Sequence, residues 1–279
     1  MDRLKDKIAV ITGAAKGIGY ETVRTFINEG AQVVMTDLDV EAGSAASAHF
    51  GTSCNFIAQD VTDESSWDKL ANHIETTYGR LDVLVNNAGV GSSTDPKPLV
   101  EYDDEFWRLT LEVNQNAPYR LTKLALPAMI AAGWGRVITV ASINSRVGSL
   151  HGAAYAASKH GVLGLMRTAA QETASLGVTV NCICPGPVRT LMNDKRIEYD
   201  AERLGRGLDD HESGLTPIGG RLEPEDIAPM AVYLASDAGR MVTGQAYNIC
   251  GGINMAWRRA LRPIRNSLSK IRPSACREI

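Results

Sequence analysis

The chain has 279 residues, of which 44% are hydrophobic and 22% charged, as in a globular protein with one large core. Its formal net charge of -3 argues against nucleic acid as a partner. The sequence has no stretch with the pattern of a signal peptide or the length and apolarity of a membrane-spanning helix, so we expect a cytoplasmic protein.

The cysteines lack the CxxC spacing of zinc or redox sites, so we expect them to be reduced and structural and predict no metal site. The five are Cys54, Cys182, Cys184, Cys250 and Cys276. Cys182 and Cys184 alternate along one predicted strand, and we expect them to face opposite covers of a buried sheet.

The first predicted strand, Lys7–Thr12, is short, apolar and β-branched, and a glycine-rich loop follows it. The amphipathic run Tyr20–Asn28 comes next. Glycines let the backbone turn tightly and approach a pyrophosphate, whose negative charge a helix N-terminus stabilises. The residues predicted to bind phosphate are Gly13, Lys16, Gly17, Ile18 and Gly19.

The second strand, Gln32–Thr36, ends in Asp37, about 20 residues beyond the loop as the dinucleotide fingerprint requires. The Asp37 carboxylate can accept hydrogen bonds from the adenosine ribose hydroxyls and would repel the 2′-phosphate of NADP. Lys16 would instead favour NADP, because its positive charge could attract that phosphate. We therefore predict NAD as the cofactor and include Leu38 among the residues that contact it.

Two further strands, Asn55–Gln59 and Leu81–Val85, flank the predicted helix Glu64–Thr77. This alternation predicts an α/β fold: a doubly wound parallel sheet of Rossmann-like type with helices on both faces. Ligands of such sheets bind beyond the carboxyl ends of the strands. The polar or glycine residues expected there are Gly13, Asp37, Asp60, Asn87 and Ser142.

A long helical stretch, residues 102–132, contains Asn114, and an Asn inside a helix is usually a surface or structural residue. The next strand, Arg136–Ala141, ends at Ser142.

Tyr155 and Lys159 are four residues apart and therefore project from the same face of a predicted helix. A neighbouring ammonium favours the phenolate, so we expect Lys159 to lower the pKa of Tyr155 towards the range of a general acid or base. The small residues on both sides, Gly152–Ala154 and Gly161–Gly164, suit a helix that packs closely against another backbone.

The last part of the predicted domain, which spans residues 1–254, begins with the strand Val178–Cys184 and a rigid turn, Pro185–Thr190. Residues 191–222 are polar and interrupted by glycines, and we expect a mobile substrate lid there. A helix, Glu225–Ser236, and a final strand, Gln245–Ile249, complete the domain.

With these motifs in order, the chain resembles the short-chain dehydrogenase/reductase family from about Leu4 to Asn254. The shared motifs are TGxxxGxG at Thr12–Gly19, Asp60, NNAG at Asn86–Gly89, Asn114, Ser142, YxxxK at Tyr155–Lys159 and the turn Pro185–Gly186. The resemblance implies a Rossmann-like fold, usually assembled as a homotetramer, and hydride transfer between a nicotinamide and an alcohol or carbonyl carbon.

In that family, Tyr155 would exchange the substrate proton, and Lys159 would lower the pKa of Tyr155 and hold the nicotinamide ribose. Ser142 would orient the substrate oxygen, and Asn114 would anchor a water that relays protons. The resemblance further implies cofactor contacts to the adenine from Asp60 and Val61, to the cofactor backbone from Asn87, Ala88 and Gly89, and to the carboxamide side from Pro185, Gly186, Val188 and Thr190.

Parts of the sequence are similar to the 3-hydroxybutyrate dehydrogenase branch, but Gly91, Asn144 and Gly152 stand where that branch has Gln, His and Lys. Without that Lys, nothing is left to neutralise a buried substrate carboxylate, whose desolvation is costly. We therefore predict a neutral secondary alcohol or ketone as substrate, for example a cyclic or steroid-like one. The alternatives are a 3-oxoacyl thioester reductase, a 3-hydroxy acid dehydrogenase, and an NAD-binding regulatory protein, against which the intact Ser142, Tyr155, Lys159 and Asn114 argue.

Residues 255–279 form a predicted basic, amphipathic extension. Its apolar residues recur at spacings of four and three, and they are Trp257, Leu261, Ile264, Leu268 and Ile271. Pro263 would break the helix into two short pieces. We favour docking of this stripe on the same subunit or on a neighbour over contact with an anionic membrane surface.

Overall fold

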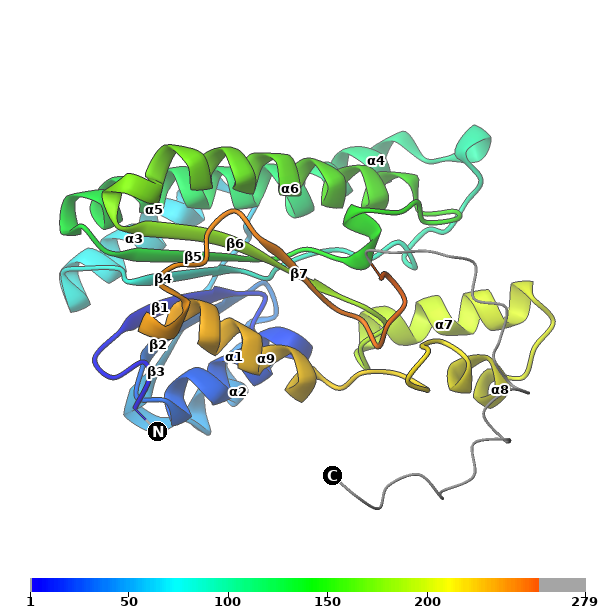
Figure 1. Ribbon diagram of the computed structural model, residues 1–279, viewed down its shortest axis with the longest axis horizontal. Coiled ribbons are helices and arrows are strands. Elements are labelled where there is room, and N and C mark those ends of the chain that lie inside the picture. Colours follow the sequence, from blue (N-terminus) through cyan, green and yellow to red (C-terminus); the bar gives the residue numbers. More distant parts are fainter. Residues whose placement is uncertain (1, 256–279) are drawn as a thin grey trace, which may run out of the picture.

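The computed structural model describes residues 2–255, which form one sheet between two layers of helices (Figure 1). The strands are β1 (Ile8–Thr12), β2 (Gln32–Asp37), β3 (Cys54–Ala58), β4 (Val83–Asn86), β5 (Gly135–Val140), β6 (Val178–Pro185) and β7 (Ala246–Ile249). The α-helices are α1 (Gly17–Asn28), α2 (Val40–Ala48), α3 (Glu64–Tyr78), α4 (Asp104–Leu111), α5 (Ala117–Ala132), α6 (Ala153–Thr173), α7 (Leu191–Arg203), α8 (Leu208–Ser213) and α9 (Pro224–Ala235). The predicted extension lies outside the described residues from position 256 onwards.

The strand order is β3-β2-β1-β4-β5-β6-β7, and every pair is parallel. The predicted doubly wound α/β fold is therefore confirmed. Because the chain turns to the opposite half of the sheet after β3, β1 and β4 lie at the switch point where such folds bind ligands.

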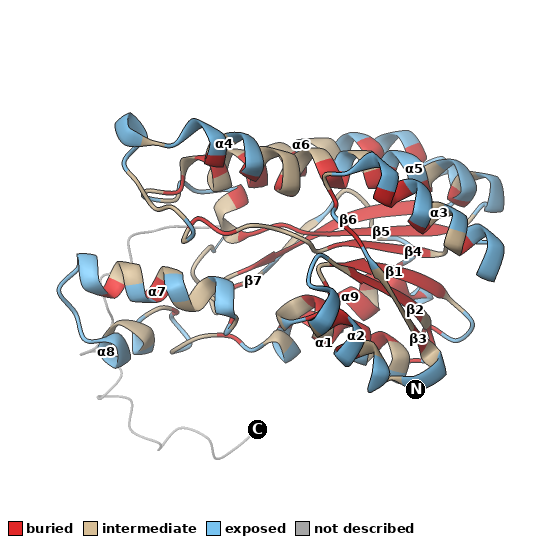
Figure 2. Cartoon of the chain, turned by 180° about the vertical axis from the view of Figure 1, so that it is seen from behind, coloured by how far each residue is buried: buried red, intermediate tan, exposed pale blue. Residues whose placement is uncertain are grey.

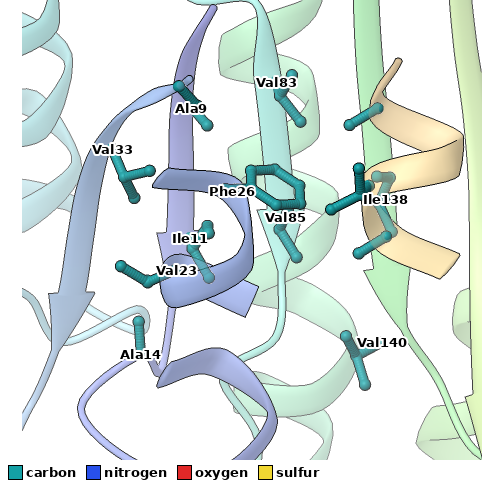
Figure 3. Packing of buried hydrophobic residues seen from close by; sticks show 14 of the residues in the cluster. Ala9, Ile11, Ala14, Val23, Phe26, Val33, Val83, Val85, Ile138 and Val140 are labelled. Atoms are coloured by element: carbon teal, nitrogen blue, oxygen red, sulfur yellow. The ribbon is translucent and has the colours of Figure 1, made fainter. Parts of the chain in front are cut away.

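The sheet is apolar on both faces, as a parallel sheet covered by helices must be. α1, α2 and α9 cover one face, and α3 to α6 cover the other (Figure 1). Ala9 and Ile11 of β1 point to the first layer and Val10 to the second. Figure 3 shows the ring of Phe26, which is fully buried, packed from α1 onto the first face. Figure 2 shows the central strands buried, the edge strands β3 and β7 less so, and the outer sides of the helices exposed.

Cys182 and Cys184 belong to the same buried cluster on the α6 face of β6, so the prediction that they face opposite covers is wrong. Residues two apart in a strand point to the same face. Both thiols are free, as are those of Cys54 and Cys250, which agrees with the predicted reduced state. Cys276 lies outside the described residues.

Two regions differ from the sequence pattern. The helical stretch 102–132 contains a π-helical segment, Glu112–Asn116, between α4 and α5. The expected lid contains two helices, α7 and α8, which lie beyond the carboxyl end of the sheet (Figure 1). Within residues 2–255, no helix has both the length and the apolar character needed to cross a membrane.

Candidate active site

A cavity of about 1280 Å³ lies at the carboxyl ends of the strands, and its walls include the loops that follow β1 to β6 together with α7. It brings together nearly all the predicted site residues. Those that line it are Gly13, Lys16, Gly17, Ile18, Asp37, Leu38, Asp60, Val61, Asn87, Ala88, Gly89, Ser142, Tyr155, Lys159, Pro185, Gly186, Val188 and Thr190. Gly19 and Asn114 do not line the cavity but lie next to residues that do, Gly13 and Gly89 respectively.

The glycine loop needs its glycines for close packing. Gly13 has a φ of 62°, and a Cβ there would lie 2.6 Å from the Cα of Ala88. A Cβ on Gly19 would lie 2.3 Å from the carbonyl oxygen of Gly13. Real side chains do not fit at such distances, so both positions are restricted to glycine by the backbone that surrounds them.

The N-terminus of α1 faces the cavity without a protein cap. Lys16 is the N-cap residue, but its side chain makes no capping hydrogen bond, and the first turn of α1 carries no acidic residue. The first amides of a helix need an acceptor, and its dipole favours an anion. A pyrophosphate meets both needs, so this loop and helix fit a dinucleotide.

Asp37, at the end of β2, is held by the backbone beside this loop. Its Oδ2 accepts a hydrogen bond from the amide of Ala15 at 2.9 Å, and its Oδ1 accepts one from the amide of Asp39 at 3.0 Å. Lys16 forms an ion pair with Asp39, with 2.8 Å between Nζ and Oδ2. The cation that could attract a 2′-phosphate therefore already has an anionic partner.

Asn87 joins the loop after β4 to the glycine loop. Its Nδ2 donates to the carbonyl oxygens of Thr12 at 2.9 Å and Gly13 at 2.8 Å. The hydroxyl of Thr12 accepts the amides of Asn87 and Ala88, both at 3.0 Å. Sequence reasoning did not single out Thr12 for this contact. Its place at the end of β1, where a hydroxyl is buried, was the available signal.

Asp60 and Val61, predicted to contact the adenine, lie in the turn after β3. The Asp60 carboxylate accepts hydrogen bonds from the amide and the hydroxyl of Thr62, at 2.9 and 2.7 Å. The carbonyl of Val61 accepts one from the indole of Trp67 at 3.0 Å. These bonds fix the turn where its residues line the cavity.

Asn114 lies in the π-helical segment and is buried. Its Oδ1 accepts the amide of Val90 at 2.8 Å, and its Nδ2 donates to the carbonyl oxygen of Val90 at 2.9 Å and to the Ser158 hydroxyl at 3.3 Å. The side chain thus ties the loop after β4 to α6. Of the two usual roles of a helical Asn, a surface or a structural position, these contacts show the structural one.

Ser142 ends β5 and starts a short 3₁₀ turn. Its Oγ accepts the amide of Asn144 at 3.1 Å, while the Oγ of Ser145 accepts the amide of Ser142 at 3.2 Å. This capping box fixes the Ser142 hydroxyl in the cavity wall.

Tyr155 and Lys159 lie on the face of α6 that forms the cavity wall. The Lys159 Nζ is 5.7 Å from the centre of the Tyr155 ring and donates to the carbonyl oxygen of Val140 at 2.9 Å. Burial lowers the pKa of Lys159 to about 8.

Burial raises the pKa of the Tyr155 phenol, and a hydrogen bond with Ser142 acts in the opposite direction. The expectation that Lys159 brings this pKa below its ordinary value is therefore wrong for the protein alone, because desolvation of the phenolate outweighs the favourable contacts.

The far wall of the cavity is contributed by α7. A Cβ on Gly91 would lie 2.5 Å from the Cγ of Met192, and a Cβ on Gly152 would lie 2.7 Å from both the Cβ of Ser92 and the Oγ of Ser149. Neighbouring side chains thus occupy the space next to these two glycines, and a larger residue at either position would require them to shift.

Arg196 of α7 also lines the cavity, and sequence reasoning missed it. Its guanidinium pairs with Asp200 one helical turn away and donates to the hydroxyl of Ser92 and the carbonyl of Leu150. The expectation that no cation remains near the substrate is therefore wrong. Only the i, i+4 spacing of Arg196 and Asp200 on a helix could have signalled the pair.

The sequence is similar to those of known proteins. The family described as enoyl-(acyl carrier protein) reductase matches residues 13–254. An uncharacterised oxidoreductase, YxjF, of Bacillus subtilis is 37% identical over 89% of this chain and 98% of its own length. The D-beta-hydroxybutyrate dehydrogenase of Cupriavidus necator is 32% identical over the same shares of the two chains. The 3-oxoacyl-acyl-carrier-protein reductase FabG of Escherichia coli is 34% identical, again over 89% and 98%.

The family match covers the glycine loop from Gly13 onwards, the Ser142, Tyr155 and Lys159 cluster and the strands β2 to β7. The chain belongs to the short-chain dehydrogenase/reductase family and is an NAD(P)-dependent oxidoreductase that acts on alcohol and ketone groups.

Proposed function

We propose that the enzyme transfers hydride between NAD(H) and a neutral secondary alcohol or ketone. The observation that carries this proposal is the arrangement of Ser142, Tyr155 and Lys159 in the same cavity as an uncapped helix N-terminus. A binding protein without turnover has no need of a phenol and an ammonium in that place, which disfavours a purely regulatory role.

The three side chains have different tasks in this proposal. The nicotinamide, when bound, accepts or supplies the hydride. The Ser142 hydroxyl binds the substrate oxygen. The neutral Tyr155 phenol donates its proton to that oxygen during ketone reduction, and its phenolate removes the proton during alcohol oxidation. The Lys159 ammonium stabilises the phenolate and binds the nicotinamide ribose.

The preference for NAD over NADP is supported by the charges near β2. Asp37 and Asp39 place two carboxylates where a 2′-phosphate would approach, and Lys16, the cation of the loop, is paired with one of them. A 2′-phosphate would have to compete with Asp39 for Lys16.

A neutral substrate is supported by the region next to α7. Gly91 and Gly152 supply no side chain, and their neighbours fill the space. Asn144 is turned to its own loop, where its Nδ2 donates to the carbonyl oxygen of Gly148 at 3.2 Å. Arg196, the cation that lies next to Ser92 in this region, is paired with Asp200.

The test is the appearance of NADH with a panel of neutral secondary alcohols at alkaline pH, run in parallel with NADP. Turnover of at least one alcohol with NAD supports the proposal. Reduction of a 3-oxoacyl thioester with NADPH, without reduction of any neutral ketone, would favour a 3-oxoacyl thioester reductase, the activity in the name of the Escherichia coli relative.

We also propose a homo-oligomer, with a tetramer expected from the family resemblance. Tyr119 and Leu124 of α5 are large apolar side chains that are 44% and 45% exposed, and exposed apolar side chains often mark contacts between subunits. Light scattering gives the mass directly. The cytoplasmic location stays a prediction, which cell fractionation would test.

A further inference from the structure

The substrate side of the cavity contains one charged pair whose purpose the proposed reaction does not explain. Arg196 and Asp200 lie one turn apart on α7, and both line the cavity. The Nε of Arg196 lies 2.7 Å from Oδ2 of Asp200, and its Nη2 lies 3.2 Å from Oδ1. The two side chains are only 17% and 19% exposed. The pair is therefore bidentate and largely removed from water.

The remaining donors of Arg196 hold it against the loops on either side of the substrate region. Nη1 donates to the Ser92 hydroxyl at 3.3 Å, and Nη2 donates to the carbonyl oxygen of Leu150 at 2.9 Å. Ser92 is also the residue whose Cβ would meet a side chain at Gly152. The guanidinium thus lies beside the place from which a cation at position 152 would extend.

A guanidinium in this place would ordinarily favour a carboxylate ligand, because planar bidentate binding of carboxylates is what arginine does best. Here an internal carboxylate already occupies the bidentate face. An acidic substrate would have to displace Asp200, and Asp200 would itself repel it across a poorly solvated space.

One further arginine contacts Asp200. Arg203 donates to Oδ1 at 3.1 Å, and it is 30% exposed and not part of the cavity lining. It therefore holds Asp200 from the outer side without adding a donor to the substrate region.

We propose that Asp200 sets the charge preference of the substrate site by occupying Arg196, and that without the Asp200 charge Arg196 would bind the carboxylate of a short 3-hydroxy acid. This inference rests on the proposed function, because it names the residues that make the site prefer a neutral substrate. Asp200 is in this account a specificity-determining residue, whereas Ser142, Tyr155 and Lys159 perform the proton chemistry.

The experiment compares two substrates with the same carbinol and different charge, 3-hydroxybutanoate and its methyl ester, with NAD. The variants are Asp200→Asn and, as a second removal of the charge, Asp200→Ser. Glu198→Gln is the matched control, because Glu198 is an exposed carboxylate of the same helix and does not line the cavity. Melting curves confirm that each variant folds.

We expect the wild type and Glu198→Gln to favour the ester in kcat/KM. In Asp200→Asn and Asp200→Ser the ratio of ester to acid should fall by about tenfold or more, the worth of one charge-assisted hydrogen bond. Adding Arg196→Met to Asp200→Asn should abolish this gain, which distinguishes Arg196 from Arg203 as the receptor. A ratio within twofold of wild type in both Asp200 variants would overturn the proposal while leaving the proposed function intact.

A binding measurement decides the proposal even if neither compound is oxidised. Butanoate is titrated into the enzyme–NADH complex, and calorimetry measures its affinity. Butanoate should bind about tenfold more tightly to Asp200→Asn than to the wild type. Equal affinities would overturn the inference. Failure of every alcohol in the panel would instead refute the proposed function, so the two failures can be told apart.

Discussion

Asn114→Ala should destabilise the protein far more than an ordinary polar substitution. The change leaves both the amide and the carbonyl of Val90 without their partner and removes the bond to Ser158. Each lost partner of a partly buried polar group costs about 1 kcal/mol or more, and the deleted atoms leave a small cavity, so we expect a loss of about 2 to 4 kcal/mol. For a domain of this size that corresponds to a fall in Tm of roughly 5 to 10 °C.

The matched control is Asn116→Ala, two residues further along the same π-helical segment. Within residues 2–255 the Asn116 side chain donates only to the partly exposed Glu112, at 2.6 Å, so its loss should cost less than about 1 kcal/mol. Urea unfolding of both variants without cofactor gives the comparison. Because Asn114 also positions the loop that contains Gly89, its variant should raise the KM for NAD. Equal stability of the two variants would refute the structural role assigned to Asn114.

Three further predictions concern the cofactor and the proton chemistry. Asp37→Asn keeps an acceptor for the Ala15 amide but removes the charge, so the ratio of kcat/KM with NAD to kcat/KM with NADP should fall by about tenfold or more. An unchanged ratio would mean that Asp37 does not set the cofactor preference. The Lys159 ammonium is present below its pKa of about 8 and is lost above it. Lys159→Met, which lacks this charge at every pH, should therefore lose alcohol oxidation mainly below about pH 8, so that its activity rises at a higher pH than that of the wild type, and it should bind NAD more weakly. Lys159→Arg is the charged control, and an identical pH profile would be the contrary result. Gly13→Ala should abolish NAD binding in a fluorescence titration, because its Cβ would meet the Ala88 backbone. The control is Gly79→Ala, which also has a positive φ, 66°, but lies in open space within the described chain, and it should bind NAD normally.

The fold was predictable because its local signals agree with one another. The predicted strands are short, mostly apolar runs, and the polar or glycine residues at or just after the ends of β1 to β5 include Gly13, Asp37, Asp60, Asn87 and Ser142. A parallel sheet brings the carboxyl ends of its strands to one edge, so the place of the cavity followed from the order of the elements alone.

The α7 wall could not be predicted in the same way. Residues 191–222 lack a strong apolar period, so the sequence pattern did not reveal α7 and its pair of Arg196 and Asp200. The bonds from Arg196 to Ser92 and Leu150 join residues far apart in the chain, and no local pattern encodes such contacts.

The pKa of Tyr155 was mispredicted for a related reason. The four-residue spacing to Lys159 indicates an attraction between ammonium and phenolate, but it contains no measure of burial. In the folded chain burial raises the pKa of the phenol and lowers that of Lys159. Burial thus disfavours the charged form of both groups, the Lys159 ammonium that would favour the phenolate and the phenolate itself.

In the proposed reaction Tyr155 transfers the substrate proton, and Tyr155→Phe removes the group that does so. The substitution removes the hydroxyl and almost no volume, so NADH should still bind with nearly unchanged affinity in a fluorescence titration. On the neutral alcohol that the wild type oxidises best, kcat should fall by about 10²-fold or more, as expected for the loss of a general acid and base. A variant that binds NADH normally and retains more than about a tenth of the wild-type kcat would contradict the account, because general acid-base catalysis is worth more than that.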